Sequence, residues 1–459
     1  MRTGGRASLV FSAVCSFAGA GTAQPAPPPA ATARPAAAAE SSRTDGFDAE
    51  LYGFVELDVI HDTTGSYVGG SNNVILQRPG TYAGDHARLQ FTANNSQIGG
   101  VVRAPEYEGM HVSAGFEVDF FGLQPTDVTE QNVYTAGGVR LRHFFLKLDT
   151  PIVDFLAGQY HDLFGWVGAG FDPNTVAFLG VPGQVYHRNP QLRVTRKFSG
   201  GGTELEVAVA AVRPAQRDSQ LPDGQAGLRF ALDGWTGAGA QGFGRPNIAP
   251  LAVGVSGVAR RFAVTEFRTN PGNPNTKNGW GFAADVFLPI IPATAENKNF
   301  ALSVTGQYSV GTGIADLYTA LTGGARFPTL TNPGDIVPPP VYVPNVDVGL
   351  VTYDADANLQ TIDWTSLLVG VQYYLPIDSG RVWVSGVYSR LESRNLATLT
   401  PRLDHGGIFT ELEYIDAGAY FAVTPFSHIG VSFQTTRQTY GDGVKNHNNR
   451  VHAGWRLFF

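Results

Sequence analysis

Residues 448–459 read Asn448-Asn449-Arg450-Val451-His452-Ala453-Gly454-Trp455-Arg456-Leu457-Phe458-Phe459. Because side chains along a strand alternate between two faces, this stretch has one apolar face and one polar face. The last strand of an outer-membrane barrel must close the cylinder against the first, and a soluble protein rarely stops inside a strand with an aromatic residue. We therefore favour a barrel strand over the edge strand of a soluble sheet. The expected closure signal consists of Val451, Trp455, Leu457 and Phe459.

Alternating segments of this kind recur almost from end to end. They number about sixteen, which is even, as bacterial barrels require, and each is near the roughly ten residues that a membrane-crossing strand needs. The sequence therefore predicts an all-β fold, a transmembrane antiparallel β-barrel, and leaves 14 or 18 strands open. We expect strands near residues 50–61, 86–103, 109–121, 138–149, 153–164, 184–198, 203–213, 224–233, 251–264, 278–289, 299–311, 361–375, 380–393, 411–424, 427–440 and 447–459.

The connections between these segments alternate between long and short, as external loops and periplasmic turns do in outer-membrane barrels. One connection, residues 234–250, breaks the pattern because it is too long for a turn. A miscounted strand there is one explanation. The long connections are 62–85, 122–137, 165–183, 214–223, 265–277, 312–360 and 394–410.

The N-terminal region has the build of an exported protein. Residues 1–23 have an arginine-bearing start, a small apolar stretch and a plausible cleavage site, so we expect a signal peptide. Residues 24–49 are rich in Pro and Ala and are expected to form a periplasmic tether, or a spacer without a role. Residues 50–459 are expected to form the barrel. Nothing between 24 and 50 is large enough for the plug of a large transporter barrel.

The composition excludes other classes of protein. Only 15% of residues are charged, which is low for a soluble surface, while 11% are aromatic and 56 are Gly. Beyond the signal there is no apolar run of the roughly 18 residues that a spanning helix needs. No basic tract suggests nucleic-acid binding.

Charged residues on the expected inward faces are the main functional candidates. Carboxylates on one wall and guanidinium groups on another would set a field across a pore and select solutes by charge. The same residues could instead form ion pairs that brace the wall, and both readings can hold together. The acidic candidates are Glu56, Asp58, Glu117 and Asp119. The candidates for attracting anions are Arg88, Arg140, Arg142, Arg193 and Arg229.

The third long loop, residues 165–183, is rich in Gly and Pro and can fold sharply. We expect it either to bend inward and narrow the channel or to lie on the surface as an ordinary loop. Its candidate constriction residues are Trp166, Phe171 and Asp172.

No other motif indicates chemistry. Residues 354–358 start like a calcium loop but lack the Gly and the final Glu. The histidines show no paired metal spacing, so we expect no metal, no cofactor and no enzymatic activity. Strand alternation places His143 on the outer face, where it would be an interface or girdle residue.

Several stretches resemble the DcaP-like outer-membrane porins. They are residues 53–58, 141–143, 157–159, 190–193 and 449–459. The resemblance implies a homotrimer of sixteen-stranded channels that favour small anionic solutes such as carboxylates. Residues 24–49 do not resemble the coiled-coil extension of that family, and the external segment 312–360 is long and Pro-rich.

We therefore expect a porin of the bacterial outer membrane that passes small hydrophilic, anionic solutes by passive diffusion. Its expected partners are outer-membrane lipid, two further copies of the chain and the outer-membrane assembly machinery. A lipase-like barrel enzyme and an adhesin that uses residues 312–360 are the alternatives.

Overall fold

The computed structural model describes residues 46–67, 76–122, 137–171, 180–241, 245–265, 274–319, 346–354, 356, 358–400 and 402–459. The expected signal peptide, most of the expected tether, Asp172 and residues 320–345 of the long external segment lie outside the described residues. No helix within the described ranges is long and apolar enough to cross a membrane.

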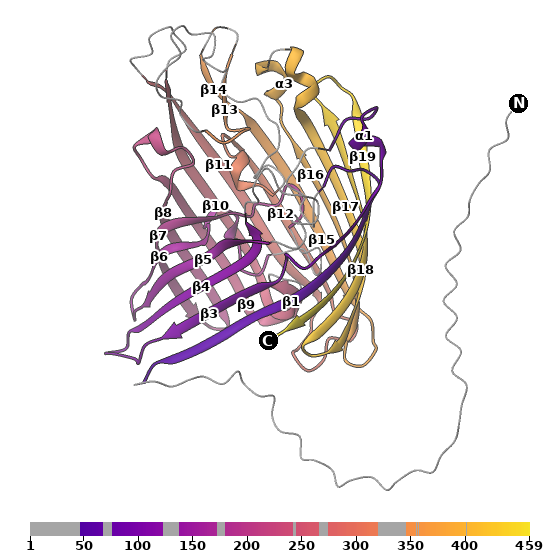
Figure 1. Cartoon of the computed structure of the whole chain (residues 1–459). Helices are drawn as coiled ribbons and strands as arrows, with labels where there is room; N and C mark the ends of the chain where they lie inside the picture. Colours follow the sequence, from indigo (N-terminus) through magenta and orange to yellow (C-terminus); the bar gives the residue numbers. More distant parts are fainter. Residues whose placement is uncertain are drawn as a thin grey trace, which may run out of the picture. The chain divides into compact units, whose positions relative to one another are not determined.

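The chain folds into long neighbouring strands (Figure 1). Short helices lie in the connections: α1 (Tyr82–Asp85), α3 (Leu396–Leu399) and the 3-10 helices η1 (Phe164–Trp166), η2 (Arg217–Ser219), η3 (Ala315–Leu317) and η5 (Arg402–Gly407). The strands are β1 (Asp48–Asp62), β2 (Arg88–Thr92), β3 (Gln97–Arg103), β4 (His111–Gly122), β5 (Gly138–Asp149), β6 (Asp154–His161), β7 (Arg188–Gly200), β8 (Thr203–Val212), β9 (Asp223–Gln241), β10 (Arg245–Thr265), β11 (Pro274–Ile291), β12 (Leu302–Thr312), β13 (Val351–Tyr353), β14 (Leu359–Thr361), β15 (Asp363–Tyr374), β16 (Val382–Glu392), β17 (Phe409–Thr424), β18 (Ser427–Tyr440) and β19 (Lys445–Phe458).

Pairing of β1 with β19 closes the sheet into a barrel. Val55 lies opposite Leu457, and the backbones of Gly53 and Phe459 exchange two hydrogen bonds of 3.1 Å. The other edge of β1 pairs first with β3 and then with β2, so those two strands share one position. The seventeen strands of the sheet therefore fill sixteen positions. The predicted antiparallel barrel of about sixteen strands is confirmed.

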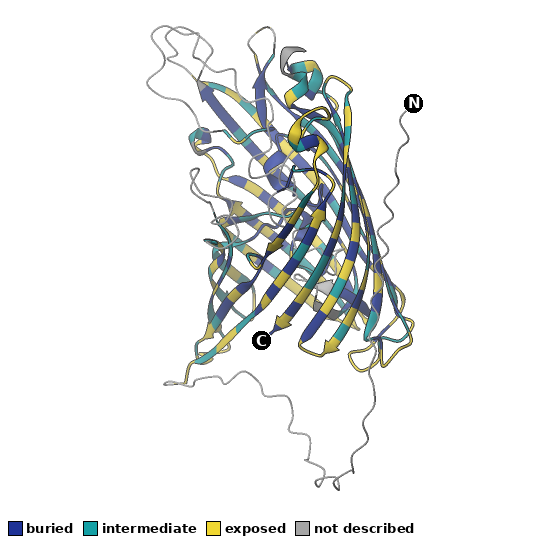
Figure 2. Ribbon diagram, turned by 45° about the vertical axis from the view of Figure 1, so that its right-hand side comes forward, coloured by how far each residue is buried: buried dark blue, intermediate teal, exposed yellow. Residues whose placement is uncertain are grey.

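The two faces of each strand meet different surroundings, and buried and exposed residues alternate along the strands (Figure 2). On β19 the outward Trp455 is 60% exposed, whereas the neighbouring inward Arg456 is 3% exposed. The four residues of the expected closure signal all lie on the exposed outer face. The apolar surface thus faces outward and the polar surface lines the lumen, as a lipid environment requires.

The described residues of the connection that is the exception in the loop pattern, 234–241 and 245–250, form a hairpin extension of β9 and β10. The two strands stay paired down to Gln241 and Arg245, with a shift in register at Pro250 and Leu251. The extension lies against the inner wall of the barrel, because Ala238 O accepts a hydrogen bond of 2.6 Å from the buried Ser303 Oγ of β12. It therefore narrows the periplasmic end of the lumen.

A hydrophobic core fills part of the external half of the lumen. It joins inward side chains of β10 and β15, such as Phe262 and Trp364, to loop residues such as Phe164, Val185 and Leu317. Connections that a loop pattern assigns to the surface thus enter the barrel and bury apolar side chains there.

Candidate functional site

The closing seam between β1 and β19 carries two buried ion pairs and one buried carboxylate–imidazole contact on its lumenal face. β1 supplies the carboxylates and β19 their partners, so both strands contribute polar side chains at the same heights. The predicted acidic residues Glu56 and Asp58 both take part. The pairs are Glu56–Arg456 at 2.7 Å, Asp58–His452 at 2.8 Å and Asp62–Arg450 at 2.8 Å.

A second charged cluster lies on β4 and β5. Arg142 Nε is 2.6 Å from Glu117 Oε1, and Arg142 Nη1 is 3.0 Å from Asp119 Oδ2. Arg140 Nη2 approaches the same Asp119 oxygen at 2.5 Å. Arg142 is buried, whereas the side chain of Arg140 is 37% exposed. Arg142 thus stabilises the wall, while Arg140 presents part of its charge to the lumen.

His143 lies on the inner face, so the prediction that it points outward is wrong. The register of β4 and β5 shifts at this point: His143 lies opposite Glu117 and Leu141 opposite Val118, which leaves Arg142 as a bulge. A bulge inserts one residue and reverses the facing of those that follow. The His143 ring then lies 4.5 Å from that of His161 and 4.8 Å from that of Tyr160.

The other predicted arginines differ in their partners. Arg229 is paired, with Nη1 at 3.3 Å from Glu204 Oε1. Arg88 donates to the carbonyl of Tyr67, and Arg193 donates to Gln191 Oε1 and to the carbonyl of His161. Within the described residues, neither Arg88 nor Arg193 has a carboxylate at ion-pair distance.

Arg188 is a lumenal cation that the sequence analysis missed. It donates to Tyr186 Oη at 3.4 Å, and the same oxygen accepts a hydrogen bond of 3.2 Å from Arg142. Strand alternation along β7 places Arg193 on the inner face, and it would place Arg188, five residues earlier, on the outer face. The rule fails because Arg188 is the first residue of the strand, where the chain leaves the lumenal loop.

The loop between β6 and β7 enters the lumen. Trp166 donates from Nε1 to Val255 O at 3.0 Å, and its ring packs on Gly227 and Gly254 of the inner wall. Phe171 also packs near Gly254. Further along, Ser366 Oγ donates to Gly183 O at 2.7 Å, so the loop crosses to the wall at β15. Trp166 and Phe171 therefore lie inside the barrel.

Asp162 and His187 join the two ends of this loop, outside the strands. His187 Nδ1 is 3.6 Å from Asp162 Oδ2, which also accepts hydrogen bonds from Asn189 and Gln225. Burial alone would raise the pKa of Asp162, but these neighbours, His187 first, lower it below its ordinary value. Burial alone would lower the pKa of His187, but Asp162 raises it above its ordinary value.

Replacing Trp166 with Ala is expected to enlarge the single-channel current and make it noisier. Truncating a buried Trp costs about 3–5 kcal/mol, which would release the loop from the wall of β9 and β10. Planar-bilayer recordings would measure the change. Trp280→Ala, which removes an exposed outward Trp from β11, is the matched control. Equal conductance of the two variants would contradict the expectation.

The described residues contain no group of three or more His, Cys, Asp or Glu that could hold a metal ion. No protein family model matches the chain, and no curated protein matches it. The outer-membrane channel DcaP of Acinetobacter baumannii has a similar structure: the TM-score is 0.62 at 18% identity, over 92% of this chain and 100% of that one. The chain has the fold of an outer-membrane channel.

Two other similar structures are more distant. OmpT of Vibrio cholerae aligns with a TM-score of 0.49 at 11% identity, over 92% of this chain and 100% of its own. An anion-selective porin from Comamonas acidovorans aligns with a TM-score of 0.48 at 11% identity, over 90% of this chain and 100% of its own.

Proposed function

We propose that the protein is a passive channel of the bacterial outer membrane for small hydrophilic anions, in particular organic carboxylates. The observation that carries the proposal is an excess of cations at one place in the lumen. Two carboxylates, Glu117 and Asp119, face a larger number of arginines there. The arginines of this lumenal cluster are Arg140, Arg142 and Arg188.

The arrangement supports an anion path along the charged wall. The loop between β6 and β7 packs on β9 and β10 on one side, while its Tyr186 contacts Arg142 on the other. The hydrophobic core occupies the space beside β10 and β15. A solute would then pass along the charged wall beside the partly exposed Arg140, which offers forked donors that match carboxylate geometry.

Reconstitution in a planar bilayer under a salt gradient tests this function. We expect channels with a linear current–voltage relation and a reversal potential whose sign indicates anion preference. Added small dicarboxylates should lower the current through these channels. A folded barrel that conducts no ions, or one that prefers cations, would overturn the proposal.

We also propose a homotrimer in which the low part of the barrel wall faces the partners. β6 has 8 residues, whereas β11 has 18 and β17 has 16. Short strands leave little wall to cross a bilayer alone, so burial against another copy is favourable there. Native mass spectrometry of the protein in detergent would show the mass of three chains. A monomer alone would contradict this.

The stability of the channel is expected to fall as the pH rises through the raised pKa of His187. The stabilisation from protonated His187 is present below its ordinary pKa of about 6.5 and is lost above the raised value. The stabilisation from ionised Asp162 is present above about 3.9 and is lost as the pH falls through its lowered pKa. The pair is therefore intact between these limits.

Thermal unfolding of the wild type and of His187→Gln as a function of pH measures this effect. The variant should lack the part of the pH dependence that lies on the alkaline side. An identical pH profile for both proteins would contradict the assignment.

A further inference from the structure

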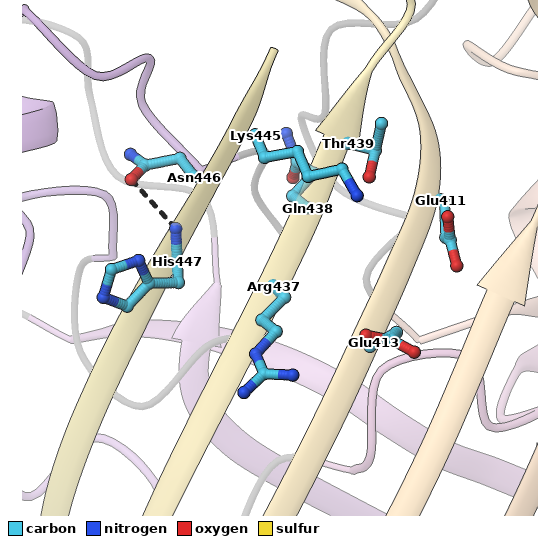
Figure 3. Close-up of a pocket in the computed structure, with 8 residues that line it drawn as sticks. All are labelled: Glu411, Glu413, Arg437, Gln438, Thr439, Lys445, Asn446 and His447. Carbon is cyan, nitrogen blue, oxygen red and sulfur yellow. Dashed lines mark hydrogen bonds between the residues drawn. The ribbon is translucent and has the colours of Figure 1, made fainter. Parts of the chain in front are cut away.

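A hollow on the outer face of β17, β18 and β19 lies near the external ends of these strands (Figure 3). Its volume is about 390 Å³. All three strands contribute polar or charged side chains, in contrast to the apolar surface along the rest of their outer faces. The lining residues are Glu411, Glu413, Arg437, Gln438, Thr439, Lys445, Asn446 and His447.

The hollow begins where the apolar outer surface ends. On β18 the outward Phe433 is 51% exposed, and Arg437 lies four residues further on, about 13 Å along the strand. On β19 Val451 lies opposite Phe433, and His447 lies opposite Arg437. The charged residues thus sit at the level where the headgroups of surrounding lipids meet the barrel.

The acidic side of the hollow already has partners. Glu411 Oε1 lies 2.9 Å from Arg390 Nε of β16. Glu413 accepts a hydrogen bond of 3.3 Å from Tyr388 Oη on the same strand. Both carboxylates therefore have partners on β16, on the side away from β18 and β19.

The basic side of the hollow lacks ion-pair partners among the described residues. Among the residues that the structure describes, neither Arg437 nor Lys445 has a carboxylate at ion-pair distance, although Glu413 lies opposite Arg437 in the register. Figure 3 shows these two side chains on neighbouring strands, with His447 beside them. Their charges are therefore available to an external anion.

The external rim of the hollow is held in place. Asn446 Nδ2 donates to Gln77 O at 2.6 Å, and Arg78 pairs with Asp442 at 2.7 Å. These contacts tie the first external segment to the turn between β18 and β19. A site whose rim is already fixed loses less entropy on binding.

We propose that Arg437 and Lys445, with His447, bind the phosphate headgroup of a glycolipid in the outer leaflet. The proposal rests on the outer-membrane location proposed above. Arg and Lys at a lipid headgroup level attract phosphate strongly, and Arg supplies forked donors that fit its oxygens. The apolar strip of Phe433 and Val451 below them fits the acyl chains of the same molecule.

Native mass spectrometry of the full-length protein in detergent tests the site, with bis-phosphorylated lipid A as the probe. We expect the double variant R437A/K445A to bind it about tenfold more weakly than the wild type, since charged hydrogen bonds are lost. The matched control R381A/K298A removes two cations from the periplasmic end and should bind like the wild type. The variant R437K/K445R keeps both charges and should retain most of the binding.

Several outcomes would overturn the proposal. Equal binding by the wild type and R437A/K445A would do so, as would equal binding of the dephosphorylated lipid. Binding of inorganic phosphate as tight as that of the lipid would rule out the lipid assignment. Loss of trimers in R437A/K445A without loss of lipid binding would assign the hollow to a second copy of the chain. Ion selectivity of R437A/K445A should match the wild type, so a failure here is distinguishable from a failure of the channel function.

Discussion

Replacing Arg140 and Arg142 with Ala is expected to shift the channel from anion preference toward cation preference. The change removes two positive charges from the lumenal wall and leaves Glu117 and Asp119 without their arginines. A unit charge acts on an ion 6 Å away with about 3 kcal/mol at an effective dielectric constant of 20. Half of this energy corresponds to a change of about tenfold in the anion-to-cation permeability ratio.

The reversal potential in a salt gradient measures this ratio. E117Q/D119N is the matched variant of opposite sign, because it removes the two carboxylates and should raise anion preference. Arg142 is buried, so the single variant R140A, at a partly exposed position, preserves the test if the double variant fails to fold. Unchanged reversal potentials in R140A and E117Q/D119N would refute the role of this cluster.

Replacing Arg260 with Ala is expected to destabilise the barrel by about 3–5 kcal/mol, because it leaves buried charge without its partner. Arg260 is 5% exposed and joins two carboxylates. Its Nη2 is 2.5 Å from Asp223 Oδ2, and its Nη1 is 2.5 Å from Asp316 Oδ1. Asp316 belongs to η3, so the arginine also fastens this lumenal segment to the wall.

Urea unfolding of the purified protein followed by tryptophan fluorescence would measure the loss. The triple variant R260M/D223N/D316N removes the charges together and should recover much of the stability, since a buried pair can be exchanged for neutral residues at small cost. A stability of R260A within error of the wild type would contradict the assignment.

The strands could be predicted because each separates lipid from lumen. On β19, Trp455 faces outward and the next residue, Arg456, faces the lumen. The amino-acid sequence therefore shows a period of two, which predicts a strand. The pairing of Arg140 with Asp119 also follows from two antiparallel strands that bring opposite charges to similar heights.

The rest depends on departures from that regularity. The bulge at Arg142 turns His143 inward, and no turn residue in the sequence marks it. Arg188 and the hairpin extension of β9 and β10 take their positions from loops and strands that fold back into the lumen. Such contacts are tertiary: Ala238 and Ser303, which share a hydrogen bond, are 65 residues apart. The roles of the predicted pore residues and of Trp166 and Phe171 remain predictions for the experiments above.

The closing seam has a consequence for how the barrel assembles. Glu56 and Arg456 are 400 residues apart in the chain, and joining such distant segments costs roughly 5 kcal/mol of chain entropy. Until β19 arrives, β1 and β18 each present an open edge on which a wrongly aligned strand could add. A slip of two residues keeps the apolar face outward, but it sets Glu56 opposite Gly454 or Phe458. The buried carboxylate of Glu56 then has no cationic partner. The charges of the seam therefore specify the register in which the last strand must pair before the barrel can close.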